Sequence, residues 1–496
     1  MNLSTTLVLL LLPTTFADNI FYMKARKALS GKDACHTLGV RRKLDTDEEK
    51  ANEKFRQYKY EELDEGLIDN NKLLARQHFF RVENQISKSK VFNVIKMFPK
   101  AALLHGHGTA LLSTKKLFQL INRFEDNLYI CIENNNVKAR YFTNPDKTCS
   151  WLLLKDWRDK NGTFDLYLKS HLSLIVDNPE ETYRNQNEIW VKFEKIFSTL
   201  SGILNYKPVF EAYLYDVLQE FYDDNVMYLE VRSGLSMLYD LNEKSYDRFE
   251  VAKIMKAIVE KFKTTHKNFF GFKIIVSTHR NQENEGVRQR AQLALDLSNL
   301  HPNFIAGFDL VGYEDKGKPL SDYKDILLQY SGQLKYFFHA GETNWFGYPA
   351  DHNLFDAILL NTTRIGHGFS ALKHPEILRK IKDAKIPLEI CPISNQVLML
   401  VSDLRNHPAN FYISKGIPIV IGSDDPSFWG AVALSHDWYY AFMAMSCRET
   451  DLRFLEKLAI NSIIASALTH AEKIIFLNKW KEQWRFFIED LIKLQL

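Results

Sequence analysis

The stretch PKAALLHGHGTALL, residues 99–112, is where the fold hypothesis starts. An apolar run ends in two histidines one residue apart, His105 and His107, and a glycine follows them. At the two-residue period of a β-strand, both imidazoles point to the same side. Two polar residues beside a turn would give the same short pattern, so its meaning depends on the rest of the chain.

Short apolar runs recur from residue 100 onward, most of them separated by helix-length amphipathic segments. The runs are KAALLHGHG, VMYLEVRS, GFKIIVSTHR, FIAGFDLVGYE, LKYFFHAGE, TRIGHG, IPLEICPIS and IPIVIGSDDP. Their apolar character is continuous rather than alternating, which is typical of parallel strands buried on both faces. Eight βα units in a row predict an α/β fold, a closed (β/α)8 TIM barrel.

Polar residues stand at or just after the carboxyl ends of these predicted strands. They are His105, His107, Arg232, His279, Gly312, Glu314, His339, Glu342, His367, Ser394, Asn395, Asp424 and Asp425. In (β/α)8 barrels this face carries the active site. The sequence therefore predicts a functional site at the barrel mouth.

A metal site is the chemistry that these residue types favour. Three imidazole nitrogens, from His105, His107 and His339, with one carboxylate oxygen from Asp424, suit Zn²⁺ with one position left open. Taken alone, the histidine pair is better read as two surface histidines. That reading does not account for HAGE, GHG and SDDP at further strand ends. The expected task of the metal is to produce hydroxide near neutral pH.

Three further residues are candidates for proton transfer and for holding the attacking water. Glu342 lies three positions past His339 and suits proton transfer to the substrate. His367 lies between two glycines, which would let a flat substrate approach while its ring orients the hydroxide. Asp425 would point away from Asp424 on a regular strand, but a turn at the strand end would let it hold the water.

Bulk composition bounds the class of protein. The chain has 496 residues, of which 46% are hydrophobic, so one large domain with additions or two domains is expected. Its 64 basic and 61 acidic side chains nearly cancel, leaving a net charge of +3. This balance predicts neither nucleic acid nor a membrane surface as a partner.

The amino-terminal residues indicate export. MNLSTTLVLLLLPTTFADN has an apolar core and small residues before a cut after Ala17, so we expect a signal peptide at 1–17 and a secreted, extracellular protein. A chance apolar start on a cytosolic protein is the alternative. No stretch is long enough to span a bilayer. If the chain is exported, Asn161 and Asn361 are glycosylation acceptors.

The expected domain organisation follows from the same pattern. Residues 18–95 are polar, charged and helix-forming, and 96–496 form the barrel, with an inserted subdomain at about 120–170 after the first strand. Cys131 and Cys149 bracket a polar loop, and their disulfide would contribute about 3 kcal/mol. We expect Cys391, in an apolar run, to be a free buried thiol. The pairing of Cys35 and Cys447 stays open.

Longer segments carry a family resemblance. MFPKAALLHGHGTA, FDLVGYED, YFFHAGETNWFG, NTTRIGHGF, EICPISNQVLMLVSDLRNHP and IGSDDPSFWG are similar to segments of the secreted adenosine deaminase-related growth factors. The resemblance covers essentially the whole chain after the signal. It implies a zinc-dependent TIM barrel, with one Zn²⁺ per subunit, that hydrolyses adenosine or 2′-deoxyadenosine to the inosine product and ammonia. It also implies a homodimer built by the N-terminal helices, a disulfide-bonded insertion that binds a cell-surface receptor or glycosaminoglycan, and growth-factor activity.

The resemblance also implies roles for single residues. Those roles are metal ligands for His105, His107, His339 and Asp424, a proton donor for Glu342, action on the water for His367 and Asp425, and a nucleoside pocket for Gly312, Trp190, Glu194 and His279.

One position departs from the family pattern. The family has aspartate directly after the second histidine, on the ribose side of the pocket, whereas this chain has Gly108. Losing a charge-assisted hydrogen bond would cost about 1.5–3 kcal/mol of substrate binding. Tolerated drift, altered nucleoside preference and a member kept mainly for signalling are the alternatives. A binding protein with weakened catalysis and a hydrolase of another heterocycle therefore stay open beside the deaminase.

Overall fold

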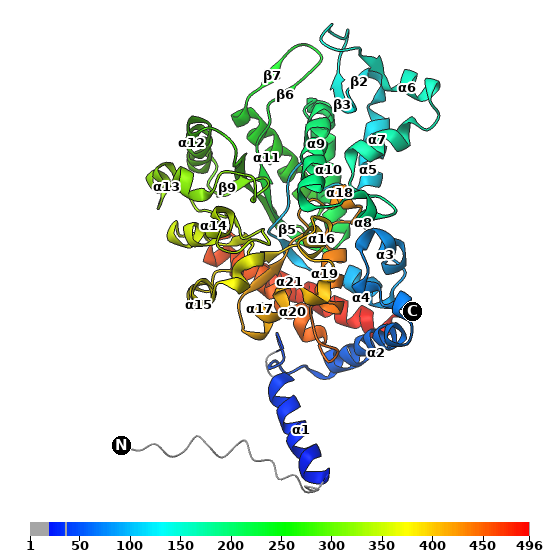
Figure 1. The fold of residues 1–496 in the computed structure, drawn as a ribbon, viewed down its shortest axis with the longest axis vertical. Helices are drawn as coiled ribbons and strands as arrows, with labels where there is room; N and C mark the ends of the chain where they lie inside the picture. The colour runs from blue at the N-terminus through cyan, green and yellow to red at the C-terminus, as the bar shows by residue number, and fades with distance from the viewer. Residues whose placement is uncertain (1–18, 35–36, 496) are drawn as a thin grey trace.

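The computed structural model describes residues 19–34 and 37–495, and two four-stranded parallel sheets form its centre (Figure 1). The first sheet consists of β1 (Ala101–Leu103), β5 (Val226–Ser233), β8 (Gly271–His279) and β9 (Ile305–Val311). The second consists of β10 (His339–Ala340), β11 (Ile365–His367), β12 (Leu388–Ile390) and β13 (Ile419–Ile421). Each of these strands falls inside one of the predicted runs.

Backbone bridges join the two sheets at both edges. Phe308 of β9 pairs with Tyr336 just before β10, and Gly106 after β1 pairs with Asp424 after β13, both in parallel. The amide N–H of Phe337 donates to the Phe308 carbonyl at 3.0 Å, and that of His107 donates to the Asp424 carbonyl at 3.1 Å. The predicted (β/α)8 barrel is therefore confirmed, and its strands are buried along nearly their whole length.

Helices surround the barrel. Those that follow β5 are α11 (Arg248–Thr265), α12 (Asn284–Leu300), α13 (Lys324–Tyr330), α14 (Pro349–Leu359), α15 (Pro375–Ala384), α16 (Pro392–Val397), α17 (Ala409–Ser414), α18 (Pro426–Trp429), α19 (Ser435–Met443), α20 (Leu452–Ala465) and α21 (His470–Lys493). Capping boxes begin α11 at Asp247 and α21 at Thr469, where a glutamate three positions on closes the box. A short hairpin of β6 (Leu238–Tyr239) and β7 (Ser245–Tyr246) lies between β5 and α11.

The amino-terminal region is helical in its described part, as predicted. Its helices are α1 (Asn19–Ala34), α2 (Thr46–Ile68), α3 (Phe79–Ile86) and α4 (Lys90–Met97). Helix α2 packs against the carboxyl-terminal α21, where the Trp484 indole N–H donates to Glu48 at 2.7 Å. Helix α1 extends away from the body, and its residues 21–33 are exposed (Figure 1).

An insertion follows the first strand. After α5 (Thr114–Arg123), an antiparallel sheet of β2 (Leu128–Glu133), β3 (Asn136–Tyr141) and β4 (Leu152–Leu153) leads into α6 (Leu154–Lys160), α7 (Phe164–Leu172) and α8 (Pro179–Thr182). The chain returns to the barrel through α9 (Gln186–Leu204) and α10 (Lys207–Asp223). A disulfide joins Cys131 and Cys149, as predicted.

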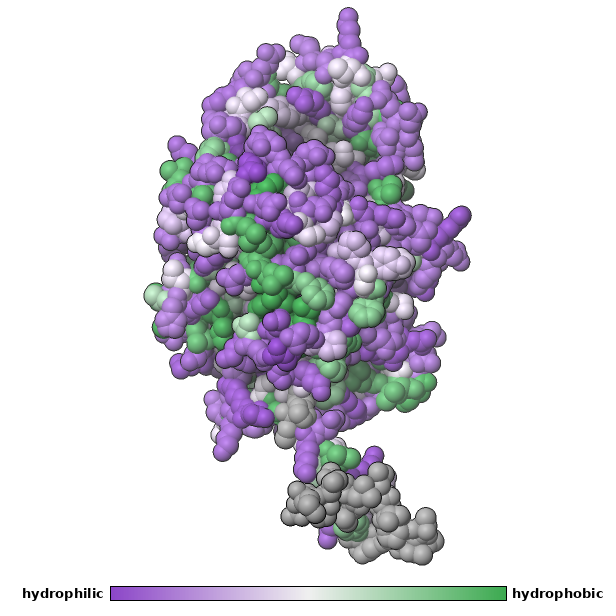
Figure 2. Space-filling model, turned by 60° about the vertical axis from the view of Figure 1, so that its left-hand side comes forward, coloured by the Kyte–Doolittle hydropathy of each residue, from purple (hydrophilic) through white to green (hydrophobic). Residues whose placement is uncertain are grey.

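Several predictions concern other parts of the chain. The expected signal peptide and Cys35 lie outside the described residues. Cys391 is a buried free thiol, as expected, and Cys447 is free among the described cysteines. No helix in the described ranges is both long and apolar enough to cross a bilayer. The face in Figure 2 is largely hydrophilic with an apolar stretch.

Candidate active site

The strand-end histidines and aspartate meet at the barrel mouth. Potential ligand atoms of His105, His339, His367 and Asp424 all lie within 4.8 Å of one another, and all four residues are buried. His367 (φ +62°) and Asp424 (φ +56°) hold left-handed backbone conformations. Such conformations cost about 1–3 kcal/mol each and cluster at functional sites.

Carboxylates behind the histidines fix the direction of two rings. His105 Nδ1 lies 2.6 Å from Glu389 Oε2, and His339 Nδ1 lies 2.6 Å from Asp309 Oδ2. This contact turns the Nε2 atom of each ring toward the cluster. Metal-binding histidines are oriented by carboxylates in this way.

The cluster leaves buried polar atoms without a hydrogen bond. These atoms are His105 Nε2, His367 Nε2 and Asp424 Oδ1. Buried polar groups are otherwise almost always satisfied, so three such atoms together indicate a missing partner. Imidazole nitrogens with one carboxylate oxygen are the donors that zinc prefers, so these residues fit a zinc ion.

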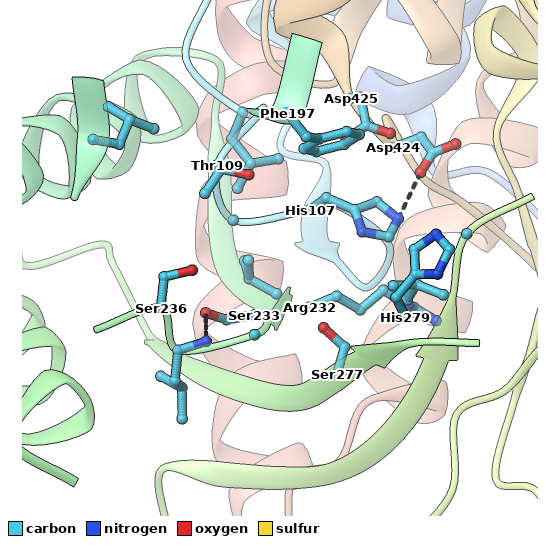
Figure 3. Close-up of a pocket in the computed structure, with 18 of the residues that line it drawn as sticks. His107, Thr109, Phe197, Arg232, Ser233, Ser236, Ser277, His279, Asp424 and Asp425 are labelled. Atoms are coloured by element: carbon cyan, nitrogen blue, oxygen red, sulfur yellow. Dashed lines mark hydrogen bonds and ion pairs between the residues drawn. The ribbon is translucent and has the colours of Figure 1, made fainter. Parts of the chain in front are cut away.

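His107 lies close to the same aspartate, Asp424, but belongs to a second cluster of potential ligands. Its Nε2 lies 3.1 Å from Asp424 Oδ1 (Figure 3), and His107, Asp424 and Asp425 form an adjoining cluster. The structure thus brings together all four predicted ligands, with Asp424 shared between the two groups. It also places His367 within the first group, beside His105 and His339.

A buried network of charges supports the cluster from below. Arg232 donates through Nη2 to Glu389 at 2.6 Å and through Nε to Asp309 at 2.8 Å. Arg364 donates through Nε to Glu389 at 2.5 Å. Burial favours the neutral form of Glu389, but the two guanidinium groups outweigh it and hold the pKa of Glu389 well below its usual range.

Sequence reasoning missed most of this network. Glu389, Asp309 and Arg364 were not singled out, although each is a charge within a short apolar run. Such an isolated charge in a buried strand is rarely tolerated without a partner. That feature is the signal that could have found them.

Glu342 lies beside the cluster in surroundings that raise the pKa of its carboxyl group. Its Oε1 lies 3.5 Å from His367 Nε2, and its own backbone N–H donates to Glu314 at 2.6 Å. Burial raises the pKa of Glu342 well above its usual value, and the charges of Asp424 and Glu314 add to the rise. A neutral carboxyl group at this place can donate a proton to a bound molecule.

The pKa values of the two adjacent aspartates are shifted in opposite directions. Burial disfavours the charge of Asp424, but the nearby imidazoles of His105 and His107, at 3.3 and 3.1 Å, outweigh it, so the pKa of Asp424 is well below its usual value. Burial raises the pKa of Asp425, and the neighbouring charge of Asp424 raises it further. Different environments for paired carboxyl groups are typical of acid–base sites.

A cavity of about 500 Å³ connects the cluster with the surface. Glu342, His367 and both aspartates line it, and so do the predicted pocket residues Gly312, Trp190, Glu194 and His279. This volume is within the range of small-molecule sites. Asn161 and Asn361 are exposed and do not line it.

The outer wall of the cavity is aromatic and closely packed. Trp190 stacks on Tyr313 with 4.6 Å between ring centroids, and Glu194 Oε1 lies 3.3 Å from His279 Nε2. Gly312 has φ +106°, and a Cβ there would lie 2.4 Å from His279 Nε2. A side chain at 312 would therefore displace His279, so the wall requires glycine there.

Comparisons with solved structures agree on the barrel fold. In solved structures, the fold is similar to an Arabidopsis N6-mAMP deaminase (TM-score 0.56, 18% identity, covering 78% of this chain and 99% of that one). It is also similar to a Burkholderia ambifaria amidohydrolase with bound Zn (TM-score 0.52, 15% identity, 81% and 94%). At these identities the likeness concerns the fold alone.

Sequence comparisons show the family. The family model described as adenosine deaminase matches residues 173–482, and that described as adenosine/AMP deaminase N-terminal matches 6–95. The chain is 41% identical to adenosine deaminase 2 of Homo sapiens (96% of this chain, 95% of that protein). It is 40% identical to an adenosine deaminase of Lutzomyia longipalpis (94% and 93%). The chain therefore belongs to the adenosine deaminase family, and the resemblance drawn from its motifs is confirmed.

Proposed function

We propose that this chain is a zinc-dependent enzyme that hydrolyses adenosine and 2′-deoxyadenosine to inosine and 2′-deoxyinosine, releasing ammonia. One observation carries the proposal. Imidazole and carboxylate atoms that lack hydrogen bonds converge at the strand ends, beside the buried carboxyl group of Glu342, in a cavity of nucleoside size. Family membership supports the substrate class.

One zinc ion per chain would be held by His105, His107, His339 and Asp424. When bound, the metal supplies Lewis-acid activation of a water molecule near neutral pH. Glu389 and Asp309 keep the rings of His105 and His339 turned to the ion, at 2.6 Å each.

The chain's own residues then move the protons. Water adds to the ring carbon that bears the amino group and gives one proton to His367, while Glu342 protonates the adjacent ring nitrogen. Asp425 holds the water in line. The carbon–nitrogen bond breaks as the proton from His367 passes to the amine, which leaves as ammonia. The remaining hydroxyl proton restores Glu342, and the product keeps a carbonyl at that carbon.

The wall residues would hold the nucleoside. The backbone of Gly312 approaches the purine ring, since the absence of Cβ leaves that wall open. Trp190 presents an indole N–H that is buried and has no hydrogen-bond partner. Glu194 and His279 pair at the cavity mouth, where the Glu194 carboxylate can accept a hydrogen bond from a sugar hydroxyl group.

Export and assembly belong to the same proposal. The apolar residues 1–17 would direct secretion, and the exposed Asn161 and Asn361 would then carry glycans. Residues 18–95 would form a homodimer, for which the exposed helix α1 offers a surface. The disulfide-bonded insertion at about 120–170 would contact a cell-surface receptor or glycosaminoglycan, and growth-factor activity would follow from that contact.

A second candidate function is an extracellular binding protein with weakened catalysis. Gly108 favours it, because the family's sugar-side aspartate is missing. Complete retention of the cluster and of Glu342 favours the enzyme instead.

Ammonia release from adenosine by the purified full-length protein decides between them. We expect chelator-sensitive turnover that falls at least about 100-fold in Glu342→Gln, the lower range of acid–base contributions. Unchanged metal content would serve as the folding control. Stoichiometric zinc without any turnover would support the binding protein.

A further inference from the structure

The active-site cavity has a second, uncharged part beyond the metal cluster. Apolar side chains from α9, α10, α11, β8 and the segment after β5 form this part, called the apolar chamber here: Leu204, Leu214, Leu235, Val251, Met255 and Phe272. Each of the six is less than a tenth exposed. The charged residues of the cavity gather instead at the metal cluster and at the Glu194–His279 mouth.

Gly108 stands where the metal end meets the apolar chamber. A Cβ at this position would lie 3.3 Å from the Arg232 carbonyl oxygen, 3.4 Å from Val231 Cγ1 and 3.8 Å from Ser233 Cβ. In Figure 3, Ser233 and Ser236 lie on the side of the pocket away from Asp424. A side chain at 108 would therefore lie against the end of β5 in the cavity wall, and glycine keeps this connection between the two parts free of bulk and charge.

Two hydroxyl groups along the chamber accept hydrogen bonds from the backbone. Ser233 Oγ accepts the N–H of Leu235 at 3.2 Å, and the Tyr213 hydroxyl accepts the N–H of Leu111 at 3.1 Å. The guanidinium of Arg232, the cation among the cavity's described lining residues, is engaged by Asp309 and Glu389. A phosphate or another anionic sugar substituent would therefore find no free guanidinium or ammonium group among the cavity's described lining residues.

Backbone strain at Leu235 indicates that the fold holds this residue in place as part of the apolar chamber. Leu235 is buried and has φ +49°, a conformation that bulky residues rarely adopt. Its side chain lines the chamber rather than the surface. Strain of this kind persists where the surrounding structure requires the position of a side chain.

We infer that the site accepts purine nucleosides whose sugar carries a small apolar 5′ group of the thioether class in place of the hydroxyl. The inference rests on the proposed deaminase function and names its substrate class. The purine would occupy the metal end, and the sugar would lie at position 108, where the family aspartate is missing. The apolar group would then enter the chamber, which a polarisable thioether suits.

Deamination of three nucleosides by the full-length protein tests this substrate class. The probes are adenosine, 5′-deoxyadenosine and 5′-deoxy-5′-methylthioadenosine, compared by kcat/KM. One apolar group in a hydrophobic pocket is worth about 10- to 200-fold in discrimination. We expect the methylthio compound to exceed both others by at least about tenfold.

Two variants should change the ratio of kcat/KM for the methylthio compound to kcat/KM for adenosine. Gly108→Asp places a carboxylate in the connection and should reverse the preference toward adenosine. Val251→Phe fills the chamber and should lower the methylthio value alone, whereas Val259→Phe, two turns along α11 and outside the cavity lining, should leave the ratio unchanged. Misfolding lowers all values together, so the ratio remains informative, and Gly108→Asp decides if Val251→Phe fails to fold.

The outcomes separate this inference from the proposed function. Adenosine turnover equal to or above that of the methylthio compound in the wild type would overturn the substrate class and leave the deaminase standing. An unchanged ratio in both Gly108→Asp and Val251→Phe would do the same. No deamination of any of the three nucleosides would overturn the proposed function, and this inference with it.

Discussion

Glu389→Gln should weaken metal binding although Glu389 is not a predicted ligand. The carboxylate accepts from Arg232 at 2.6 Å and Arg364 at 2.5 Å, and it holds His105 Nδ1 at 2.6 Å. Glutamine keeps one acceptor oxygen and presents an N–H₂ donor where a second acceptor stood. Two buried guanidinium groups would then share a neutral partner, and breaking a buried ion pair costs about 3–5 kcal/mol of stability.

The effect on the metal is a separate quantity. Loss of the carboxylate behind a metal-binding histidine typically lowers metal affinity 10- to 100-fold, about 1.4–2.7 kcal/mol. Zinc competition with a chromophoric chelator measures the affinity, and denaturant unfolding of the apoprotein measures the stability. Asp451→Asn is the matched control, because Asp451 is also buried and pairs with Arg453, at 2.7 Å, between α2 and α20.

The control should lose stability and keep its zinc affinity. Glu389→Gln should lose both. Zinc affinity within twofold of the wild type in Glu389→Gln, with unfolding as in Asp451→Asn, would refute the orienting role of the carboxylate.

Three further substitutions test the fold, its pH dependence and the pocket wall. Burial raises the pKa of Glu456 to about 7, so the folded state binds this proton more tightly than the unfolded chain does. The free energy of unfolding should therefore fall by at most about 3 kcal/mol as the pH rises from 4.5 to 7. Urea titrations should show a smaller decline in Glu456→Gln, and an identical dependence of the unfolding free energy on pH would contradict the assignment. Gly202→Ala places a Cβ 1.9 Å from the Ala139 carbonyl oxygen, so α9 must move off β3 and the free energy of unfolding should fall by about 1–3 kcal/mol. Unchanged stability in calorimetry would contradict this close contact. Gly312→Ala combines φ +106° with a 2.4 Å approach to His279 and should raise the KM for adenosine about tenfold, or 1.4 kcal/mol, with the zinc content unchanged; an unaltered KM would exclude this wall from substrate contact.

The barrel could be predicted because its signals are local. Each strand is a short apolar run, and polar residues such as His105, His339 and Asp424 stand at the run ends, which meet at one face of any parallel barrel. The disulfide could be predicted for a similar reason, because Cys131 and Cys149 bracket one loop.

Other features depend on contacts across the barrel that a linear pattern does not contain. Glu389 meets Arg232, which lies 157 positions away, and nothing near either residue specifies the pairing. His367 was predicted to act on the water, but its place among the potential ligand atoms of the first cluster follows from the pairing of β11 with β10. The apolar chamber forms between α9, α10, α11, β8 and the segment after β5, so its existence follows from how these elements pack rather than from their composition.

Reconstitution of the apoprotein with zinc tests the central claim most directly. Adenosine turnover is measured while zinc is added to chelator-stripped, full-length protein of known concentration. The account predicts no turnover at the start, a linear rise, and saturation at one zinc per chain. Full turnover by protein shown to be free of metal would contradict it.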